Sequence, residues 1–492
     1  MQCVRLWPGG RAVRGENTST ERPVRPGWTL VLVAVCAFLT SLDVMVVVTA
    51  IPTIRQDLDA GLADLEWTIN AYNLAFGCLM LTGAALGDRF GRMKVYVLGL
   101  AVFTAASAMA ALAPTVGVLI LSRVLQGVAA GVAIPVSLTL LSNAYPPEKR
   151  GMAMGIWGSV SGLAVAAGPV VGGLITQGLS WHWIFWLNVP IGLAATVLSA
   201  KLLRESYGPR PELDLVGLAL VSIGLFGLVW AAVRQPVLGW GDPEVLLSIV
   251  GGLVLLVAFV LWEKRVTHAM LPMAYFRSRG FTIANVSAFF QHFALIGALF
   301  MLAQMFQEGL GNDPMGTGLR LLAWTAMPLL VAPIAGNFAD RLGNRPFMVA
   351  GLLLQGVGLA WIAAVAQPDT GYGSFIVPLI LGGVGIAMCL PTTINLVFAS
   401  VPQNDVGVAS GVNSAVREIG GVFGVVSLGA AFATYGHYGD PAAAMGGFRA
   451  ALVVGAIASM VGMVAALFAP GKTQPGPHTA PMAAPVGLDT LE

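Results

Sequence analysis

Four ionisable side chains lie within long apolar stretches of this 492-residue sequence. Asp43 belongs to the first stretch, Arg123 to the fourth, and Arg417 and Glu418 to the thirteenth. A charged group at the centre of a bilayer costs about 2.5 to 3.5 kcal/mol, so such residues are rare and mark sites that handle ions or substrates. Carboxylates at this depth can take up and release protons, and a guanidinium group can pair with the ionised form. The four residues are therefore candidates for proton coupling.

The stretches that carry these residues are predicted to be membrane-spanning helices. Hydrophobic residues make up 57% of the chain and charged residues 10%, in fourteen apolar runs long enough to cross a bilayer. No soluble fold hides so much apolar surface. In lipid every backbone N–H and C=O group must be hydrogen-bonded within the protein, as it is in a helix. The strands of a membrane barrel would be shorter and would alternate in polarity, so these runs are expected to be helices. The sequence therefore predicts an all-α polytopic membrane protein with 14 transmembrane helices.

The basic residues predict the orientation of these spans. An even number of spans places both termini on the same side of the membrane. Only Arg55, Arg234, Arg320 and Arg449 fall in gaps on the opposite side, whereas the other basic residues outside the spans share the side of the termini. Because basic loops stay in the cytoplasm, we expect a multi-pass protein of the plasma membrane with both termini cytoplasmic. The net charge of +2 is then a topology signal and does not indicate nucleic-acid binding.

The chain also contains an internal repeat. An offset of 256 residues aligns spans four and five with spans twelve and thirteen, and an offset of 252 aligns the loop at Asp88 with the loop at Asp340. Glycine-rich helices can match by chance, but the order of the matches argues against chance. Such repeats are typical of secondary transporters, in which the substrate site lies between two halves. The matched pairs are Gly127 with Gly383, Pro135 with Pro391, Gly151 with Gly407, Gly155 with Gly411, and Gly168 with Gly424.

The repeat predicts the domain organisation and fails at the ionisable residues. Arg123 aligns with Leu379, while Arg417 and Glu418 align with Ser161 and Gly162. Asp43 has no acidic counterpart before Glu308. Residues that only one half carries are candidates for function more than for a shared scaffold. The predicted segments are a disordered tail (1–26), a six-helix bundle (27–205), two linker transmembrane helices (206–280), a second six-helix bundle (281–470) and a disordered tail (471–492).

A short charged loop follows the second span. It reads LGDRFGRMK over residues 86–94 and has a partial repeat at Asp340 and Arg341. Its glycines, Gly87 and Gly91, allow a tight turn, and its basic residues hold the loop in the cytoplasm. Asp88 can interact with the amino terminus of a neighbouring helix. An ordinary basic turn is the alternative interpretation. The residues assigned to this gating loop are Gly87, Asp88, Arg89, Gly91, Arg92, Asp340 and Arg341.

Taken with this loop, the chain resembles the major facilitator superfamily, and within it the fourteen-helix drug:proton antiporters of the EmrB/QacA type. The likeness rests on LDVMVVVTAIP (42–52), LGDRFGRMK (86–94), LSRVLQGVAAGVAIP (121–135), GLAVAAGPVVGG (162–173) and SGVNSAVREIGGVFG (410–424). The resemblance implies two pseudo-symmetric six-helix bundles plus two inserted helices. It also implies that Asp88 and Arg89 help to lock the inside-closed state and that Arg123 takes part in proton transfer. Gly168, Pro169, Gly172 and Gly173 then form the antiporter signature of the fifth helix.

The sequence departs from the family pattern near the candidate residues. Met45 and Val48 stand where the family usually has Thr and Asn, and Glu418 follows Arg417 where Gln is common. Some relatives carry an acidic residue in the tenth helix that recognises cationic drugs, but here that span has none before Asp340. A strict preference for divalent cations is therefore not expected.

Further polar and aromatic residues are candidates for the substrate cavity. Gln126 lies three residues after Arg123, so that both share a helix face, and Asn413 lies four residues before Arg417. Trp157 lies before the signature of the fifth span. Packing or interfacial anchoring is the alternative for the aromatic residues, a structural clamp is the alternative for Arg417 and Glu418, and His292 is interpreted as a packing residue. The full cavity set is Tyr72, Asn73, Gln126, Trp157 and Asn413.

Other chemistries find little support in the sequence. The four cysteines form neither a disulfide framework nor a metal-ligand spacing, so neither a metal nor a cofactor is expected. The segment ALFAPGKT (466–473) fits the loose phosphate-loop pattern, but it leaves the last span for a Pro-rich tail with no strand before it and no helix after it. Use of ATP is therefore not expected.

These observations predict a transporter and no enzyme. We expect a monomeric, proton-coupled antiporter that exports small lipophilic or amphipathic compounds, such as drugs or antibiotics, across the plasma membrane by alternating access. The alternatives are a symporter or uniporter for a metabolite and, from another class, a membrane sensor or enzyme. The sequence names neither the substrate nor the proton stoichiometry, and it leaves open which carboxylate carries the coupled proton.

Overall fold

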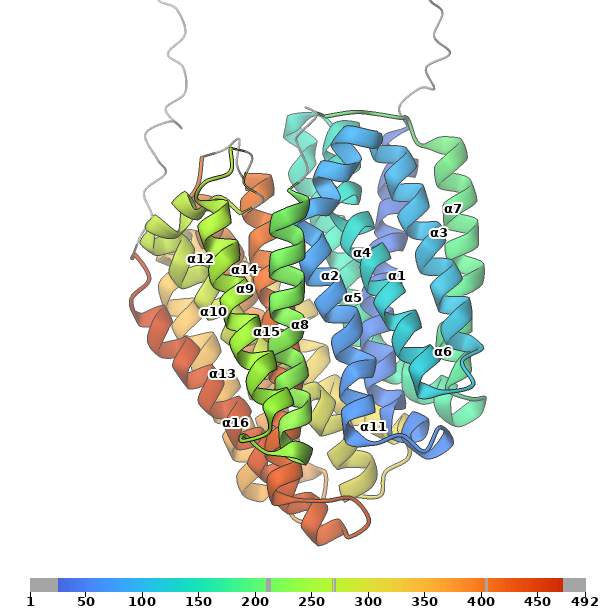
Figure 1. Ribbon diagram of the computed structural model, residues 1–492, viewed down its shortest axis with the longest axis vertical. Helices are drawn as coiled ribbons and strands as arrows, with labels where there is room; N and C mark the ends of the chain where they lie inside the picture. The colour runs from blue at the N-terminus through green and yellow to red at the C-terminus, as the bar shows by residue number, and fades with distance from the viewer. Residues whose placement is uncertain (1–24, 209–213, 268, 270, 403–405, 472–492) are drawn as a thin grey trace, which may run out of the picture.

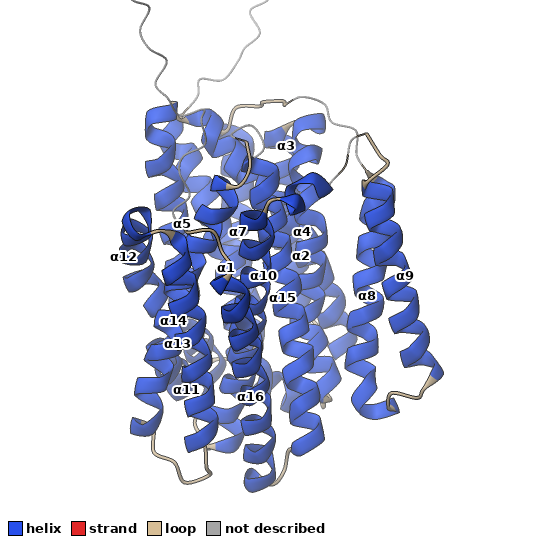
Figure 2. Ribbon diagram, turned by 90° about the vertical axis from the view of Figure 1, so that its left-hand side faces the viewer, coloured by secondary structure: helices blue, strands red, loops and turns tan. Residues whose placement is uncertain are grey.

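The computed structural model describes residues 25–208, 214–267, 269, 271–402 and 406–471. Within these ranges the chain folds into helices and contains no strand. The helices run side by side along the long axis of the molecule (Figures 1 and 2). α1 (Pro26–Asp57) begins and α16 (Pro441–Leu467) ends on the same face of the bundle, which we call the tail face; the opposite face is the far face.

The first six spans form what we call the N-half. They are α1, α2 (Leu62–Phe90), α3 (Arg92–Ala111), α4 (Val116–Ala144), α5 (Pro147–Gly178), and a sixth span that is broken into α6 (His182–Trp186) and α7 (Asn188–Leu202). α2 bends by 56° between its parts Leu62–Met80 and Thr82–Phe90. Thirteen other stretches, each one helix or two helices in line, are long and apolar enough to cross a membrane. The described residues therefore contain fourteen spans if the bent α2 counts as one.

The last six spans form the C-half. They are α10 (Arg279–Gln304) with its π-helical end η2 (Met305–Gly309), a span broken into α11 (Pro314–Thr325) and α12 (Met327–Leu342), then α13 (Asn344–Val365), α14 (Gly373–Ala399), α15 (Val406–Tyr435) and α16. The inserted pair is α8 (Leu215–Leu238) and α9 (Pro243–Glu263), and a short 3-10 helix, η1 (Met273–Arg277), precedes α10.

Local sequence explains where several helices start and break. Asp214, Asp242, Asp313 and Asp440 accept backbone N–H groups at the starts of α8, α9, α11 and α16, which satisfies donors that a helix leaves unpaired. Proline stands in the first turn of α9, α11 and α16, where its missing N–H is not needed. Pro328 also stands in the first turn of α12, so it separates that helix from α11 within one span.

The two halves repeat the same helix pairings. α1 packs on α5 and α3 on α4 in the N-half, and α10 packs on α15 and α13 on α14 in the C-half. This arrangement agrees with the predicted fold class, an all-α membrane protein with two pseudo-symmetric bundles and an inserted pair. The helix starts differ from the predicted segments by one or two residues, since α1 begins at Pro26 and α10 at Arg279. The predicted tails lie almost entirely outside the described residues.

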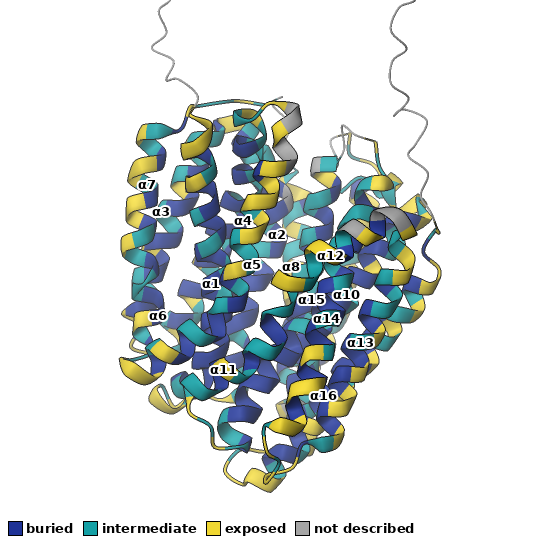
Figure 3. Cartoon of the chain, turned by 180° about the vertical axis from the view of Figure 1, so that it is seen from behind, coloured by how far each residue is buried: buried dark blue, intermediate teal, exposed yellow. Residues whose placement is uncertain are grey.

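The inserted pair covers one side of the junction between the halves. α8 contacts both α2 and α15, and α9 packs on α8 at the outside of the molecule (Figure 2). Trp67 of α2 packs against Phe226 and Trp230 of α8 in tilted arrangements, with ring centroids 5.6 and 6.0 Å apart. Buried residues line the inside of both halves and exposed apolar residues cover the outside (Figure 3), as expected when lipid is the solvent.

Candidate functional site: buried charges between the halves

Asp43 and Arg123 form a buried ion pair in the N-half. Asp43 of α1 is 3% exposed and Arg123 of α4 is 1% exposed. The Arg123 Nη1 atom donates to Asp43 Oδ2, and its Nε atom donates to the backbone oxygen of Thr68 on α2 at 3.1 Å. Neither residue has a charged counterpart in the other repeat. The two charges therefore neutralise each other, one from α1 and one from α4. A pair this deeply buried loses hydration on both sides and depends on further hydrogen bonds.

Three more polar residues complete the network around the Asp43 carboxylate. Gln126 of α4 accepts from Arg123 Nη1 at 2.8 Å and donates to Asp43 Oδ1 at 3.1 Å and to Ser107 Oγ at 2.8 Å. Asn188 of α7 donates to Asp43 Oδ1 at 2.7 Å. The structure thus places Arg123 and Gln126 together, but Gln126 is 0% exposed and does not line an open cavity in this conformation. Asn188 was not among the residues predicted from the sequence, although an amide inside the sixth apolar run was a usable signal.

Tyr72 connects this network to the C-half. The Arg123 guanidinium lies over the Tyr72 ring, 4.4 Å from its centroid, an arrangement that stabilises a buried cation. Tyr72 is itself 3% exposed and lies within electrostatic range of both Asp43 and Glu418. Tyr72 therefore interacts electrostatically with charges of both halves.

Glu418 and Arg417 lie on α15, opposite the Asp43 network. No ion pair joins these two described neighbours, and the Arg417 Nε atom is buried without a hydrogen-bond partner. This geometry argues against a simple clamp between them. Glu418 instead lies 4.0 Å from the Nε2 atom of His292 on α10, and its side chain is 19% exposed. The interpretation of His292 as a packing residue is thus incomplete, because its ring faces the candidate carboxylate.

The remaining cavity candidates occupy different surroundings. Asn413 donates to Asn285 on α10 at 3.2 Å instead of pairing with Arg417. Asn73 is 1% exposed, and its amide nitrogen has no partner among the described residues. Trp157 packs against an apolar cluster of α1, α3 and α4, and its indole nitrogen is also buried without a partner. Both groups can therefore donate a hydrogen bond to a ligand without breaking an existing bond.

The signature helix α5 packs through its small residues against both halves. Gly168 lies against Met45, and Gly172 lies against Thr49 and the backbone of Val46, all on α1. Gly173 faces the other half, where a β-carbon would collide with the backbone oxygen of Pro314 and lie 2.8 Å from its carbonyl carbon.

Pro169 takes part in the same contact between the halves. Its backbone oxygen occupies the space in front of Gly318 on α11, and Thr325 donates to the oxygen of Ala166 at 3.3 Å. Close approach of small residues is the usual way in which membrane helices associate. The signature therefore forms part of the contact between the halves.

Gly173→Ala is expected to weaken the closed contact on the far face. The added methyl group overlaps the Pro314 backbone, and overpacking of this kind costs about 1 to 3 kcal/mol. The variant should therefore export about tenfold more slowly than wild type, measured as initial efflux rate in cells of equal expression. Gly178→Ala is the matched control, because a β-carbon there meets no atom within 4 Å. Equal rates for both variants and wild type would contradict the packing role.

The far face is closed by polar contacts between the halves. Arg55 at the end of α1 pairs with Glu308 of η2 at 3.3 Å and lies 3.7 Å from the centroid of the Tyr438 ring. Gln307 donates to the Thr49 backbone oxygen at 2.9 Å, and Gln177 of α5 donates to Asp313 at 2.9 Å. These residues come from both halves, so the far-face ends of the two bundles are joined.

The halves pack less closely toward the tail face. Gly155, Gly158 and Gly162 lie on the part of α5 nearest this face, and a β-carbon at any of them would meet no atom within 4 Å. On α12, which ends at the same face, Ile334 is 57% exposed and Phe338 is 50% exposed. The conformation is therefore closed on the far face and looser on the tail face.

The part of the gating loop at residues 87–92 contacts the N-half and the segment that follows α7. Arg92 Nε donates to Asp88 Oδ1 at 2.7 Å. Glu205, which follows α7, accepts the backbone N–H groups of Met93 and Lys94 at 2.9 and 3.2 Å. Asp88 was predicted to interact with the amino terminus of a neighbouring helix. At the amino terminus of α3, Glu205 takes that place. Sequence reasoning missed Glu205, whose only signal was an acid among basic residues.

Two glycines shape this loop. Gly91 has φ +106°, which favours glycine, and a β-carbon there would lie 2.9 Å from the Glu205 carboxyl carbon. Gly87 packs against Val136 of α4, and a β-carbon on Gly87 would lie 2.8 Å from a methyl group of Val136. Arg89 is exposed and lies 5.7 Å from the centroid of the Phe90 ring. The side chains of Asp340 and Arg341, at the matching end of α12, lie outside the described residues.

Asp88→Asn is expected to slow the transport cycle without abolishing substrate binding. The change removes the charge of the Asp88–Arg92 contact, and a hydrogen bond to a charged group contributes about 1.5 to 3 kcal/mol. The export rate should fall about tenfold, whereas the Kd for substrate, measured by tryptophan fluorescence on purified protein, should stay unchanged. Loss of binding would contradict a gating role for this residue.

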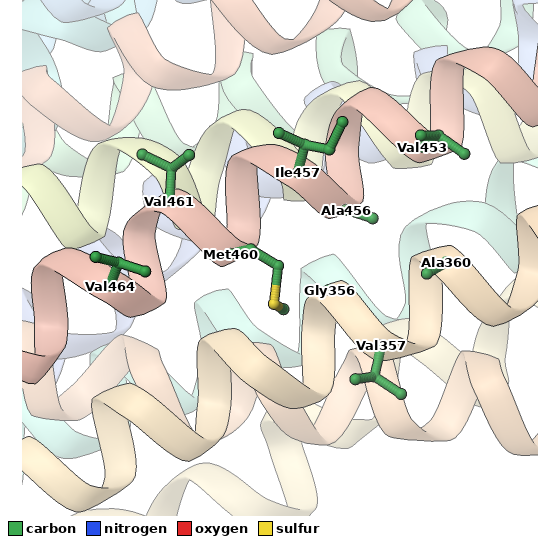
Figure 4. Close-up of a pocket in the computed structure, with 9 residues that line it drawn as sticks. All are labelled: Gly356, Val357, Ala360, Val453, Ala456, Ile457, Met460, Val461 and Val464. Atoms are coloured by element: carbon green, nitrogen blue, oxygen red, sulfur yellow. The ribbon is translucent and has the colours of Figure 1, made fainter.

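A groove on the surface of the C-half lies away from these charges. It runs between α13 and α16, has a volume of about 530 Å³, and is lined by residues such as Gly356, Val357, Ile457 and Met460 (Figure 4). Its lining is apolar and it opens to the outside of the C-half, so it has the character of a lipid-facing surface. The groove is not the site where the candidate charges meet.

The comparisons with known proteins identify the family. A family model described as the Major Facilitator Superfamily matches residues 33–303 and 281–489. The chain belongs to the major facilitator superfamily. This finding confirms the expectation drawn from the five sequence segments, and it makes the chain a membrane transporter of small molecules.

Relatives of the chain are named for drug and antibiotic resistance. The tetracenomycin C resistance and export protein of Streptomyces glaucescens is 35% identical over 412 residues, which cover 83% of this chain and 76% of that protein. A puromycin resistance protein of Streptomyces alboniger is 34% identical over a match that covers 93% of this chain and 93% of that protein. The probable multidrug resistance protein EmrY of Escherichia coli is 30% identical over 82% of this chain and 80% of that protein. The chain is thus similar to proteins named for resistance to drugs and antibiotics, one of them also for export.

Solved structures support the fold independently. A crystal structure of the peptide transporter POT in complex with sulfate superposes on this chain with a TM-score of 0.66. The alignment covers 90% of this chain and 96% of the transporter. The sequence identity is 16%, so the likeness extends to the fold alone. The two-bundle architecture is therefore shared with that transporter.

Proposed function

We propose that this protein is a proton-coupled antiporter that exports small lipophilic or amphipathic compounds, drugs or antibiotics among them, by alternating access. The observation that carries the proposal is the buried Asp43–Arg123 pair with its ligands Gln126 and Asn188. Buried ionisable groups of this kind mark ion pathways in membrane transporters. The names of the relatives supply the class of substrate.

Protonation of Asp43 would disturb this network strongly. The ionised carboxylate is held by one guanidinium group and two amide donors. A proton on Asp43 removes the negative charge and leaves Arg123 buried without a counter-ion, a situation that costs several kcal/mol. Movement of α1 against α4, or renewed access of Arg123 to a carboxylate elsewhere, relieves that cost. Proton binding and conformational change are therefore coupled through one ion pair.

Glu418 provides the second carboxylate of the proposed cycle. It lies on the C-half, partly exposed, beside His292 and within electrostatic range of Tyr72. An ionised Glu418 can hold a cationic or amphipathic substrate, and a proton on Glu418 weakens that hold. Exchange then requires only that substrate and protons compete for overlapping carboxylates in the two states. One charge moving down 100 mV supplies about 2.3 kcal/mol, so ATP is not needed.

The conformation fits one step of this cycle. The far face is closed by Arg55, Glu308 and their neighbours, whereas the tail face is looser. With both termini in the cytoplasm, this is an inward-facing state that takes up substrate from the cell interior. Rocking of the halves about the glycine contacts of α5 would open the far face and release the substrate outside. A monomer is sufficient for this mechanism.

Transport in reconstituted vesicles tests the proposed function. Protein in liposomes with an imposed pH difference is supplied with puromycin, or with ethidium as a fluorescent amphipathic cation, and movement of the compound is followed before and after an uncoupler. We expect accumulation against a gradient in the direction opposite to the proton flow, and its loss on uncoupling. Movement in the same direction as protons would favour a symporter, and movement indifferent to the uncoupler would favour a uniporter.

A further inference from the structure

Glu66 is a buried carboxylate that the proposed cycle does not yet use. It lies in the first turns of α2 near the far face and is 4% exposed. No hydrogen bond or ion pair joins its side chain to another described residue. Its carboxylate packs against Gly429 of α15, where a β-carbon would collide with Glu66 Oε1. Only a glycine at position 429 lets the carboxylate enter the junction between the halves.

Glu66 begins a polar row along the junction of α2 and α15. Residues 66, 70, 73 and 77 share one face of α2, because a helix advances by 100° per residue. At the other end of this row, a β-carbon on Gly77 would lie 3.2 Å from the Cβ atom of Glu418. Asn70 and Asn73, between the two ends, are 0% and 1% exposed and have buried amide atoms without a described partner. Glu66 and Glu418 therefore lie at opposite ends of one line of buried polar groups.

The charged groups around Glu66 leave it without a counter-ion. Tyr438, in the loop after α15, lies within electrostatic range of Glu66. Arg55 of α1 lies over the Tyr438 ring and is paired with Glu308 of η2. Arg123 of α4 is paired with Asp43. On the inserted pair, Arg234 of α8 is paired with Glu244 of α9, and on α2 itself the Asp64 carboxylate accepts the Gly61 N–H group.

We propose that Glu66 is a proton-binding site on the far face, and that the junction of α2 and α15 closes only when this carboxyl group is neutral. An ionised carboxylate buried without a partner costs several kcal/mol, whereas the neutral acid is tolerated far better. When the junction opens, the carboxylate meets water and releases its proton as H⁺. When it closes, Glu66 takes up one proton from the far side.

This inference rests on the proposed antiport and adds a step to it. The proton that permits closure comes from outside the cell, so closing of the emptied transporter depends on the external proton supply. Asn70 and Asn73 do not titrate, but their amides continue the polar row toward Glu418. Glu66 is thus placed to receive external protons ahead of the central carboxylates.

Spin-label distances across the far face test the proposal. Labels are attached at Leu112, which is 67% exposed in the N-half, and at the exposed Asp369 in the C-half, in a cysteine-free variant reconstituted in nanodiscs. Wild type should shift from the short distance at acid pH to a longer one at alkaline pH, with at least a tenfold rise in the open-to-closed ratio. Glu66→Gln should keep the short distance at every pH. Asp64→Asn, the same chemical change two residues away, should behave like wild type.

A stability measurement guards against a purely structural effect. Because wild type alone must bury a charge at alkaline pH, the Tm of Glu66→Gln should exceed that of wild type increasingly as pH rises. A Glu66→Gln variant that opens with pH as wild type does overturns the proposal, as does a wild type with no pH-dependent opening. Uncoupler-sensitive export, measured on the same preparations, separates the two ideas. If wild type shows uncoupler-sensitive export while the far face of Glu66→Gln opens with pH as in wild type, the proposed role of Glu66 is wrong and the proposed antiport stands.

Discussion

Asp43→Asn is expected to abolish proton-coupled export while the protein still reaches the membrane. Asparagine keeps the shape of the side chain, so contacts with Gln126 and Asn188 can persist in part, but it carries no charge for Arg123 and no titratable proton. Removal of one partner of a buried pair costs about 3 to 5 kcal/mol, and each 1.4 kcal/mol is a factor of ten. The rate of uphill export should therefore fall by about 100-fold or more.

The measurement for Asp43 is drug accumulation in cells of equal expression, with and without an uncoupler. Asp369→Asn is the matched control, since this residue is exposed in the loop between α13 and α14 and should behave as wild type. Fluorescence-detected size exclusion verifies that the Asp43 variant folds. Uncoupler-sensitive export by folded Asp43→Asn at the wild-type rate would show that the coupled proton binds elsewhere.

Glu418→Gln is the second change with a large expected effect. It should also abolish proton-linked export, because the amide binds substrate without competing protons. Glu418 differs from Asp43 in its surroundings, since it is partly exposed and lies beside His292 instead of being held by a guanidinium group. The variant should therefore retain downhill movement of the compound, which needs no proton exchange. Loss of a contact to a charged group, worth about 1.5 to 3 kcal/mol, should also weaken binding of cationic compounds about tenfold or more.

Counterflow in liposomes separates these two effects of Glu418→Gln. Downhill exchange of labelled ethidium should continue in the variant, while accumulation driven by a pH difference should be lost. Glu244→Gln is the control, because this carboxylate pairs with Arg234 at the outside of the inserted helices. Accumulation by Glu418→Gln equal to that of wild type would remove Glu418 from the coupling mechanism.

Much of the fold follows from composition and hydropathy alone. Each predicted span coincides with a helix or a broken pair of helices, because only a helix satisfies its own backbone in lipid. The internal breaks were not predicted. The bend of α2, the π-helical end of α10 and the division between α11 and α12 depend on packing against neighbours, although Pro328 marks one of them in the sequence.

The candidate site could be predicted in its charges more than in its partners. Asp43 and Arg123 are visible because an ionised group in an apolar run is rare, yet nothing in the sequence shows that they meet. Asn188 reaches Asp43 only because α7 packs against α1, and His292 reaches Glu418 only because α10 packs against α15. Glu66 lies at the edge of its apolar run, where an acid is common, so its burial against Gly429 emerges only from the structure.

Substrate-dependent proton movement tests the central claim most directly. Liposomes that contain the protein and a pH-sensitive dye receive puromycin or ethidium on the side from which the compound is taken up, with no pH difference imposed. The account predicts that movement of the compound drives protons in the opposite direction in wild type, and that Asp43→Asn and Glu418→Gln give no proton signal. Transport of the compound by wild type with no accompanying proton movement would contradict it.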